Sequence, residues 1–216
     1  MKKILILAAM TFSLISVAQE KITEGKITSK QSISTDNEQV QAQLDMMGDM
    51  QSVTYFKGAI SRSEVSSPMT GEVVTIIDNE EKKMLMLMDN PGLGKVYTLE
   101  SIELSEEDLK NVEVIEGTET KTVLGYECKQ YKASVSKDGI KMDVIMYTTE
   151  KIDIASKDTA TMGDKVKGFP LYMEMKVNQM GIDMTVTTEV TKIEAETVSD
   201  DQLDMTPPEG YKNLKG

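Results

Sequence analysis

The residue types that most often carry out chemistry in proteins are scarce in this chain, which contains no histidine and a single cysteine, Cys128. Without histidine the chain lacks the usual general base near neutral pH and the commonest zinc ligand. It also lacks a nucleophile elbow and a dinucleotide fingerprint, and residues 92–95 do not have the glycine spacing that cradles phosphates. We therefore predict that the protein is not an enzyme, and we expect no catalytic residue, cofactor or metal site.

Methionine is the unusual residue of this composition, with 17 copies against three phenylalanines and no tryptophan. Its side chain is flexible and polarizable, so a surface lined with methionine fits acyl chains of several shapes. The same pattern also arises from a core that uses methionine to fill gaps, and thioethers are ligands for Cu(I). The candidate ligand-binding residues, chosen by their alternation along expected strands, are Met84, Met86, Met88, Met142, Met146, Met173, Met175 and Met184.

These methionines need β-hairpins to position them, and the alternation of apolar and polar residues predicts such hairpins. Residues 72–78 and 83–89 form one hairpin, whose second arm is apolar on both faces, so both of its faces should be covered. Residues 140–146 return with one apolar face after a glycine turn. Residues 171–177 and 182–190 show the clearest alternation in the chain and form the last hairpin.

The end of the chain is expected to leave the sheet. In a regular strand Ile193 and Val190 would project to opposite faces of the sheet, although both are apolar, which predicts a bulge near Thr191. Pro207 and Pro208 cannot donate ladder hydrogen bonds, so the sheet should end before them.

One convincing amphipathic helix is expected in the first third of the chain. Thr35, with Glu38 three residues later, fits a capping box, and the helix should end near Gly48. The helix covers one face of a sheet, or it acts as a lid over a cavity. The side chains expected on its apolar face are Val40, Leu44 and Met47. A second, short helix is expected over residues 105–110.

Residues 1–18 have the pattern of a secretory signal peptide. Lys2 and Lys3 precede the largely apolar residues 4–15, and residues 16–18 are small enough for a cleavage site. The apolar stretch is too short for a comfortable membrane span. We expect an exported protein, located in the periplasm or secreted, in which residues 19–216 form a single β-rich domain. No cysteine sits at the expected cleavage point, so we expect no lipid anchor.

The charge of the chain is strongly acidic, at −12. Removal of Lys2 and Lys3 lowers the number of cationic residues from 24 to 22 against 36 acidic ones, which gives −14. Such a charge repels phosphate backbones, so nucleic acid is not an expected partner. The lone Cys128 is expected to be a small buried hydrophobe, although a free thiol or an intermolecular disulfide is the alternative.

Three short motifs carry a resemblance to a known family. They are residues 121–129 around the glycine turn at Gly125, residues 168–171 (Gly-Phe-Pro-Leu) and residues 208–211 (Pro-Glu-Gly-Tyr). In these motifs the chain resembles a family of secreted bacterial envelope proteins described only as a domain of unknown function. That family is similar to the LolA/LolB-like half-barrel of the periplasmic lipoprotein carriers and their outer-membrane receptor. The resemblance implies an open sheet with an apolar concave side.

We therefore predict a mainly β fold, an antiparallel open half-barrel of roughly eight to eleven strands with one main helix against its concave face. The predicted function is to bind or carry an apolar ligand, a lipid or the acyl chains of a lipoprotein, on the methionine-rich concave surface. A structural or protein-interaction module that engages an envelope partner through a strand edge is the alternative. A methionine-based copper binder is a further alternative.

Overall fold

The computed structural model describes residues 20–67, 71–137, 140–154, 156, 159, 162–179 and 181–215. The expected signal peptide, residues 1–18, lies outside these residues. None of the helices among them is long and apolar enough to cross a membrane.

A single sheet of 12 strands makes up most of the described chain, in the order β12-β6-β5-β4-β3-β2-β1-β11-β10-β9-β8-β7. Neighbouring strands pair antiparallel, except that β12 pairs parallel with β6. The strands are β1 (Glu24–Thr35), β2 (Met50–Lys57), β3 (Ile60–Ser67), β4 (Gly71–Asp78), β5 (Lys83–Asn90), β6 (Gly94–Ser101), β7 (Val112–Val123), β8 (Tyr126–Lys137), β9 (Ile140–Thr149), β10 (Phe169–Gln179), β11 (Ile182–Glu194) and β12 (Lys212–Asn213). The helices are α1 (Glu38–Met47) and α2 (Glu106–Lys110), with 3-10 turns at Gly163–Lys165 and Asp200–Leu203.

The prediction of a mainly β, antiparallel open sheet is confirmed. The expectation that the sheet ends before Pro207 was wrong, because the chain beyond the prolines returns to pair Lys212 with Val96 of β6. This short strand β12 also raises the strand number above the expected range.

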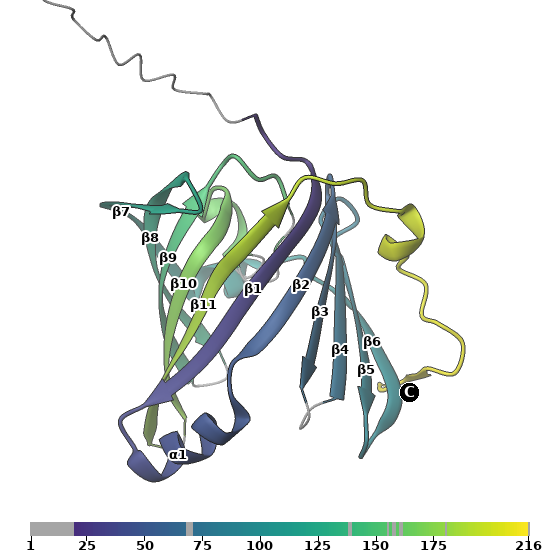
Figure 1. The fold of residues 1–216 in the computed structure, drawn as a ribbon, viewed down its shortest axis with the longest axis horizontal. Coiled ribbons are helices and arrows are strands. Elements are labelled where there is room, and N and C mark those ends of the chain that lie inside the picture. The colour runs from purple at the N-terminus through teal and green to yellow at the C-terminus, as the bar shows by residue number, and fades with distance from the viewer. Residues whose placement is uncertain are drawn as a thin grey trace, which may run out of the picture.

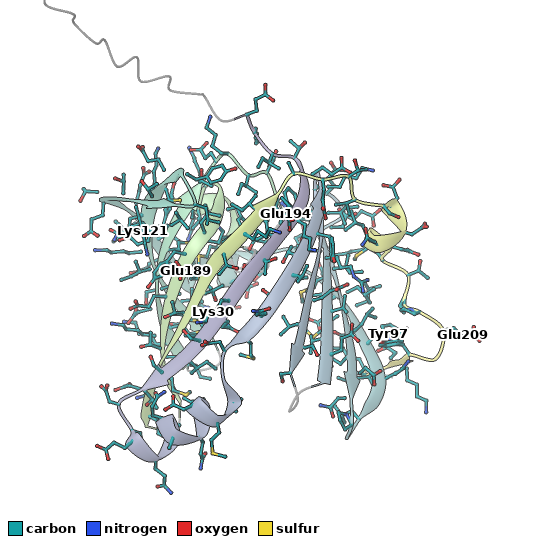
Figure 2. The ribbon with its side chains drawn as sticks, viewed as in Figure 1. Lys30, Tyr97, Lys121, Glu189, Glu194 and Glu209 are labelled. Carbon is teal, nitrogen blue, oxygen red and sulfur yellow. The ribbon has the colours of Figure 1, made fainter. Side chains whose placement is uncertain are left out.

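The sheet bends about its central strands β11, β1 and β2, so that a β7–β10 wing and a β3–β6 wing lie on either side of them (Figure 1). Side chains alternate between two faces along each strand, and directly paired residues share a face. We call the face that carries Met146 and Met173 the inner face and the opposite one the outer face. Lys30 of β1 and Glu189 of β11 are directly paired and lie together on the outer face (Figure 2).

Buried side chains form three clusters. The inner cluster of the β7–β10 wing contains Val112, Tyr131, Ala133, Val135, Val144, Met146, Met162, Val166 and Met173. The central cluster contains Ile27, Phe56, Val123, Cys128, Ile152, Phe169, Leu171 and Val190. The outer cluster of the β3–β6 wing contains Val74, Ile76, Leu85 and Leu87, covered by Met205 and Tyr211 from the C-terminal segment. Strand β5 is therefore covered on its Leu85 face, whereas Met84, Met86 and Met88 on the opposite face are only half-buried, so the expected cover of both faces holds for one of them.

Two local irregularities follow the sequence closely. Leu124 and Gly125 both have positive φ, 49° and 83°, which makes the two-residue turn between β7 and β8. Thr28 pairs with Lys192 and Ser29 with Val190, so Thr191 is the extra residue of a bulge. The predicted glycine turn and the predicted bulge are both confirmed.

The N-cap of helix α1 lies two residues later than expected. Its N-cap is Asn37, whose Oδ1 accepts a hydrogen bond from the Val40 N–H at 3.1 Å, and its C-cap is Gly48 with a φ of 68°. The predicted cap, Thr35, was wrong, because its hydroxyl instead donates to the Asp183 carbonyl at 2.6 Å and ties β1 to β11. No residue of α1 is buried.

Candidate ligand-binding cavity

A cavity of about 480 Å³ lies between the two wings on the inner face of the sheet. Strand β5 contributes Met84 from the β3–β6 wing, and β9 and β10 contribute Met142, Met173 and Met175 from the other side. Ligand sites in proteins usually measure about 300 to 1,000 Å³ and are mostly apolar. The size and lining of this cavity are therefore those of a small-molecule site.

Strand register places these methionines on one surface. Met173 pairs with Met146, and Val177 pairs with Met142, across β9 and β10. Directly opposed residues of an antiparallel pair project to the same side, so the thioethers gather on the inner face. Met146 is fully buried beneath them, at 0% exposed.

Two chain segments outside the strands lie across the inner face and border the cavity. Residues 102–111 join β6 to β7 and include α2, which begins with a capping box. The Ser105 Oγ accepts a hydrogen bond from the Asp108 N–H at 3.1 Å, and an Asp108 carboxylate oxygen accepts one from the Ser105 N–H at 3.0 Å. The predicted short helix after Ser105 is confirmed. Ile102, Leu104 and Asp108 of this segment line the cavity.

The second crossing segment, residues 162–168, leads into β10 and buries Met162 and Val166 in the inner cluster. Lys165 ties the two segments together, because its ammonium group donates to the Leu109 carbonyl at 2.8 Å and to the Val112 carbonyl at 2.6 Å. Gly163 lies so close to Leu104 that an added Cβ would contact it at 3.4 Å. The two segments form one cover over the methionines.

In the described part of the chain, the charged groups that line the cavity are all acidic. They are Glu100, Glu103 and Asp108. Glu100 forms an ion pair with Lys215 at 2.9 Å. Since no lysine or arginine is among the described lining residues, these residues offer no countercharge to an anionic group.

The structure brings together half of the methionines predicted from sequence. Met84, Met142, Met173 and Met175 line the cavity, with Met146 packed behind them. Met86, Met88 and Met184 belong to the inner face by strand parity but do not line this cavity. Their role in binding stays a prediction.

The predicted lid residues lie elsewhere. Val40, Leu44 and Met47 do not line the large cavity. Leu44 and Met47 instead border a smaller cavity of about 200 Å³ with Ile33, at the end of β1. The cover consists of the two crossing segments. Met162 and Leu104 of these segments were missed because neither residue belongs to a helical or strand period in the sequence.

Cys128 is fully buried in the central cluster, as expected. Its thiol donates to the Tyr126 carbonyl at 3.5 Å, and burial raises the pKa of the Cys128 thiol to about 11. A neutral, buried thiol is a poor nucleophile.

Among the described residues, no three His, Cys, Asp or Glu side chains come together to hold a metal ion. A copper site made of thioethers stays a prediction.

A search of curated proteins gave no match. Among solved structures, PNGF-II in its P21 crystal form aligns with 89% of this chain and 32% of its own chain, at 15% identity and a TM-score of 0.48. MucB in complex with MucA(peri) aligns with 84% of this chain and 54% of its own, at 8% identity and a TM-score of 0.39. The Mycobacterium tuberculosis lipoprotein LppX aligns with 82% of this chain and 89% of its own, at 7% identity and a TM-score of 0.32. The chain thus spans about a third of the length of PNGF-II.

A protein-family model covers most of the sheet and both crossing segments. It matches residues 39–211, from α1 to the last residue before β12. The chain therefore belongs to the family described as domain of unknown function (DUF4412).

Proposed function

We propose that this protein binds an apolar ligand, a lipid or the acyl chains of a lipoprotein, in the cavity between the wings. The observation that carries the proposal is the convergence of Met84, Met142, Met173 and Met175 from both wings on one cavity of about 480 Å³. The protein acts by binding and not by catalysis, in the bacterial envelope, to which residues 1–18 direct it.

The driving force is the burial of hydrocarbon. Each buried methylene contributes roughly 0.8 kcal/mol, so a few methylenes outweigh a surface salt bridge. Methionine side chains adjust their three torsions to the ligand, which suits a cavity that accepts chains of different shape. The two crossing segments joined by Lys165 then keep water from the bound chain.

The experiment is native mass spectrometry of the mature protein purified from its own envelope, together with solvent extraction and lipid analysis. We expect a reproducible bound mass that extracts as lipid. The variants Met142→Gln and Met175→Gln should lower the bound fraction about tenfold, because an amide without a partner costs about 1–3 kcal/mol against hydrocarbon. Met46→Gln is the matched control, since Met46 is 89% exposed on α1. A ligand-free mass that does not change after incubation with envelope lipids would overturn the proposal.

A second candidate function is a protein-interaction module, favoured by the edge strand β7. This strand stands last in the sheet order, and Ile115 on it is 68% exposed. An edge with free backbone groups can accept a strand from a partner. A photocrosslinker placed at Ile115 should then capture an envelope protein, whereas one placed at Met46 should not.

A further inference from the structure

A second cavity, of about 70 Å³, lies on the inner face of the central strands, and its lining differs from that of the first. Strands β1 to β4 and β11 contribute mostly hydroxyl side chains to it. These are Ser29, Ser52, Thr54, Ser61, Ser63, Thr75 and Thr188. Gln31 lines both cavities, so the hydroxyl-lined cavity adjoins the methionine-lined one.

Strand register makes this a continuous row of hydroxyls. Thr54 pairs with Ser63, and Ser63 pairs with Thr75 on the next strand. The Thr54 hydroxyl donates to the Ser63 Oγ at 3.1 Å. The Ser63 oxygen is the acceptor in that bond. Because a hydroxyl offers one donor and two acceptor positions, the bond does not use the Ser63 hydroxyl proton.

None of the described residues that line the hydroxyl-lined cavity is charged, although the same strands are rich in charge on the outer face. Arg62 and Glu64 form an ion pair there at 2.7 Å, and Lys26 lies over the Tyr55 ring. A charged group moved into the inner cavity would lose its hydration without gaining a countercharge, which is costly. The acidic lining of the neighbouring cavity adds repulsion against an anion.

We propose that the ligand is an amphiphile whose head group is uncharged and carries hydroxyls. Its hydrocarbon chain lies among Met84, Met142 and Met173, and its head group bonds to the hydroxyls of β1 to β4 and β11 beside Gln31. Acylglycerols and glycosyl lipids share this chemistry, whereas fatty acids and phospholipids do not. The inference rests on the proposed function and names the ligand class of the same site.

The test compares ligands that share a chain of twelve carbons and differ in the head group. Monolaurin, dodecyl glucoside and laurate are titrated below their micellar concentrations into delipidated mature protein, and dissociation constants are measured by calorimetry. We expect monolaurin and dodecyl glucoside to bind at least about tenfold more tightly than laurate, because only laurate brings a charge. Equal binding of all three would overturn the head-group inference and leave the proposed function standing. No binding of any of the three would overturn the proposed function as well.

A pair of neighbouring variants locates the head group. Thr188 lines the hydroxyl cavity, whereas Thr187, the preceding residue, projects to the outer face opposite Glu174. Thr188→Val should weaken monolaurin binding about three- to tenfold, the effect of one lost hydrogen bond, and leave laurate binding unchanged. Thr187→Val should change neither. If Thr188→Val affects both probes equally, or neither, the head group does not lie in this cavity.

Discussion

The two wings of the sheet use the same alternation of side chains, but β3 and β4 of one wing turn hydroxyl side chains inward where β9 and β10 of the other turn apolar ones. On β9 and β10 the inner positions are apolar, as at Val144 and Met173. On β3 and β4 the inner positions include Ser63 and Thr75, while the apolar Ile76 points outward. The alternation therefore shows that the two faces differ, and it does not show which of them faces the cavity.

The C-terminal segment explains this inversion. Tyr211 packs on the outer cluster of the β3–β6 wing, and Lys95 lies over its ring at 5.8 Å from the centroid. The Leu214 N–H donates to the Tyr97 carbonyl at 2.9 Å, which holds the segment at the edge of β6. A second hydrophobic cluster can form outside the sheet because this segment covers it. The inner positions of β3 and β4 are then not needed for the core of this wing and carry hydroxyl side chains.

The largest expected effect tests whether stability and binding reside on opposite faces of one strand. Leu85 is 0% exposed in the outer cluster, whereas its neighbour Met84 lines the cavity. Leu85→Ala should lower the free energy of unfolding by about 2–5 kcal/mol without changing the ligand preference. Met84→Ala should cost roughly 1 kcal/mol and weaken lipid binding. Urea denaturation with parallel calorimetry measures both. Equal losses of stability in the two variants would contradict the division between the faces.

Alkaline pH should act on the β7–β10 wing through Cys128. Burial raises the pKa of this thiol from 9.0 to about 11, so between these values the folded protein keeps the proton that the unfolded chain loses. The free energy of unfolding should therefore fall as pH rises from about 9 to 11, by at most about 3 kcal/mol.

The control for this pH dependence is Cys128→Ala. Burial also raises the pKa values of Tyr131, Tyr147 and Tyr172, so part of the decline persists in the variant. The difference between the two urea-denaturation series, recorded at several pH values, isolates the thiol. Parallel curves for the two proteins would show that Cys128 does not titrate in this range.

The regular parts of the fold could be predicted from sequence because their signals are local. The hairpin of β10 and β11 and the bulge at Thr191 follow from side-chain parity alone. The cover of the cavity could not be predicted, since Leu104 and Met162 lie in segments whose position depends on contacts between distant parts of the chain. The hydroxyl cavity was missed for another reason: a serine such as Ser63 at an alternating position is expected to face water.

The smallest expected effect concerns α1, the helix predicted to be a lid. None of its residues is buried, and Met47 is 43% exposed. Joint replacement of Val40, Leu44 and Met47 by serine should change the free energy of unfolding by only about 0.5 kcal/mol per site. The same variant should release a bound fluorescent lipid at an unchanged rate. Leu104→Ser, in the segment that does cover the cavity, should speed release. If the α1 variant releases lipid faster than Leu104→Ser does, α1 moves over the cavity during binding. The segment that controls release is then α1, at the end of β1, and not residues 102–111 between β6 and β7.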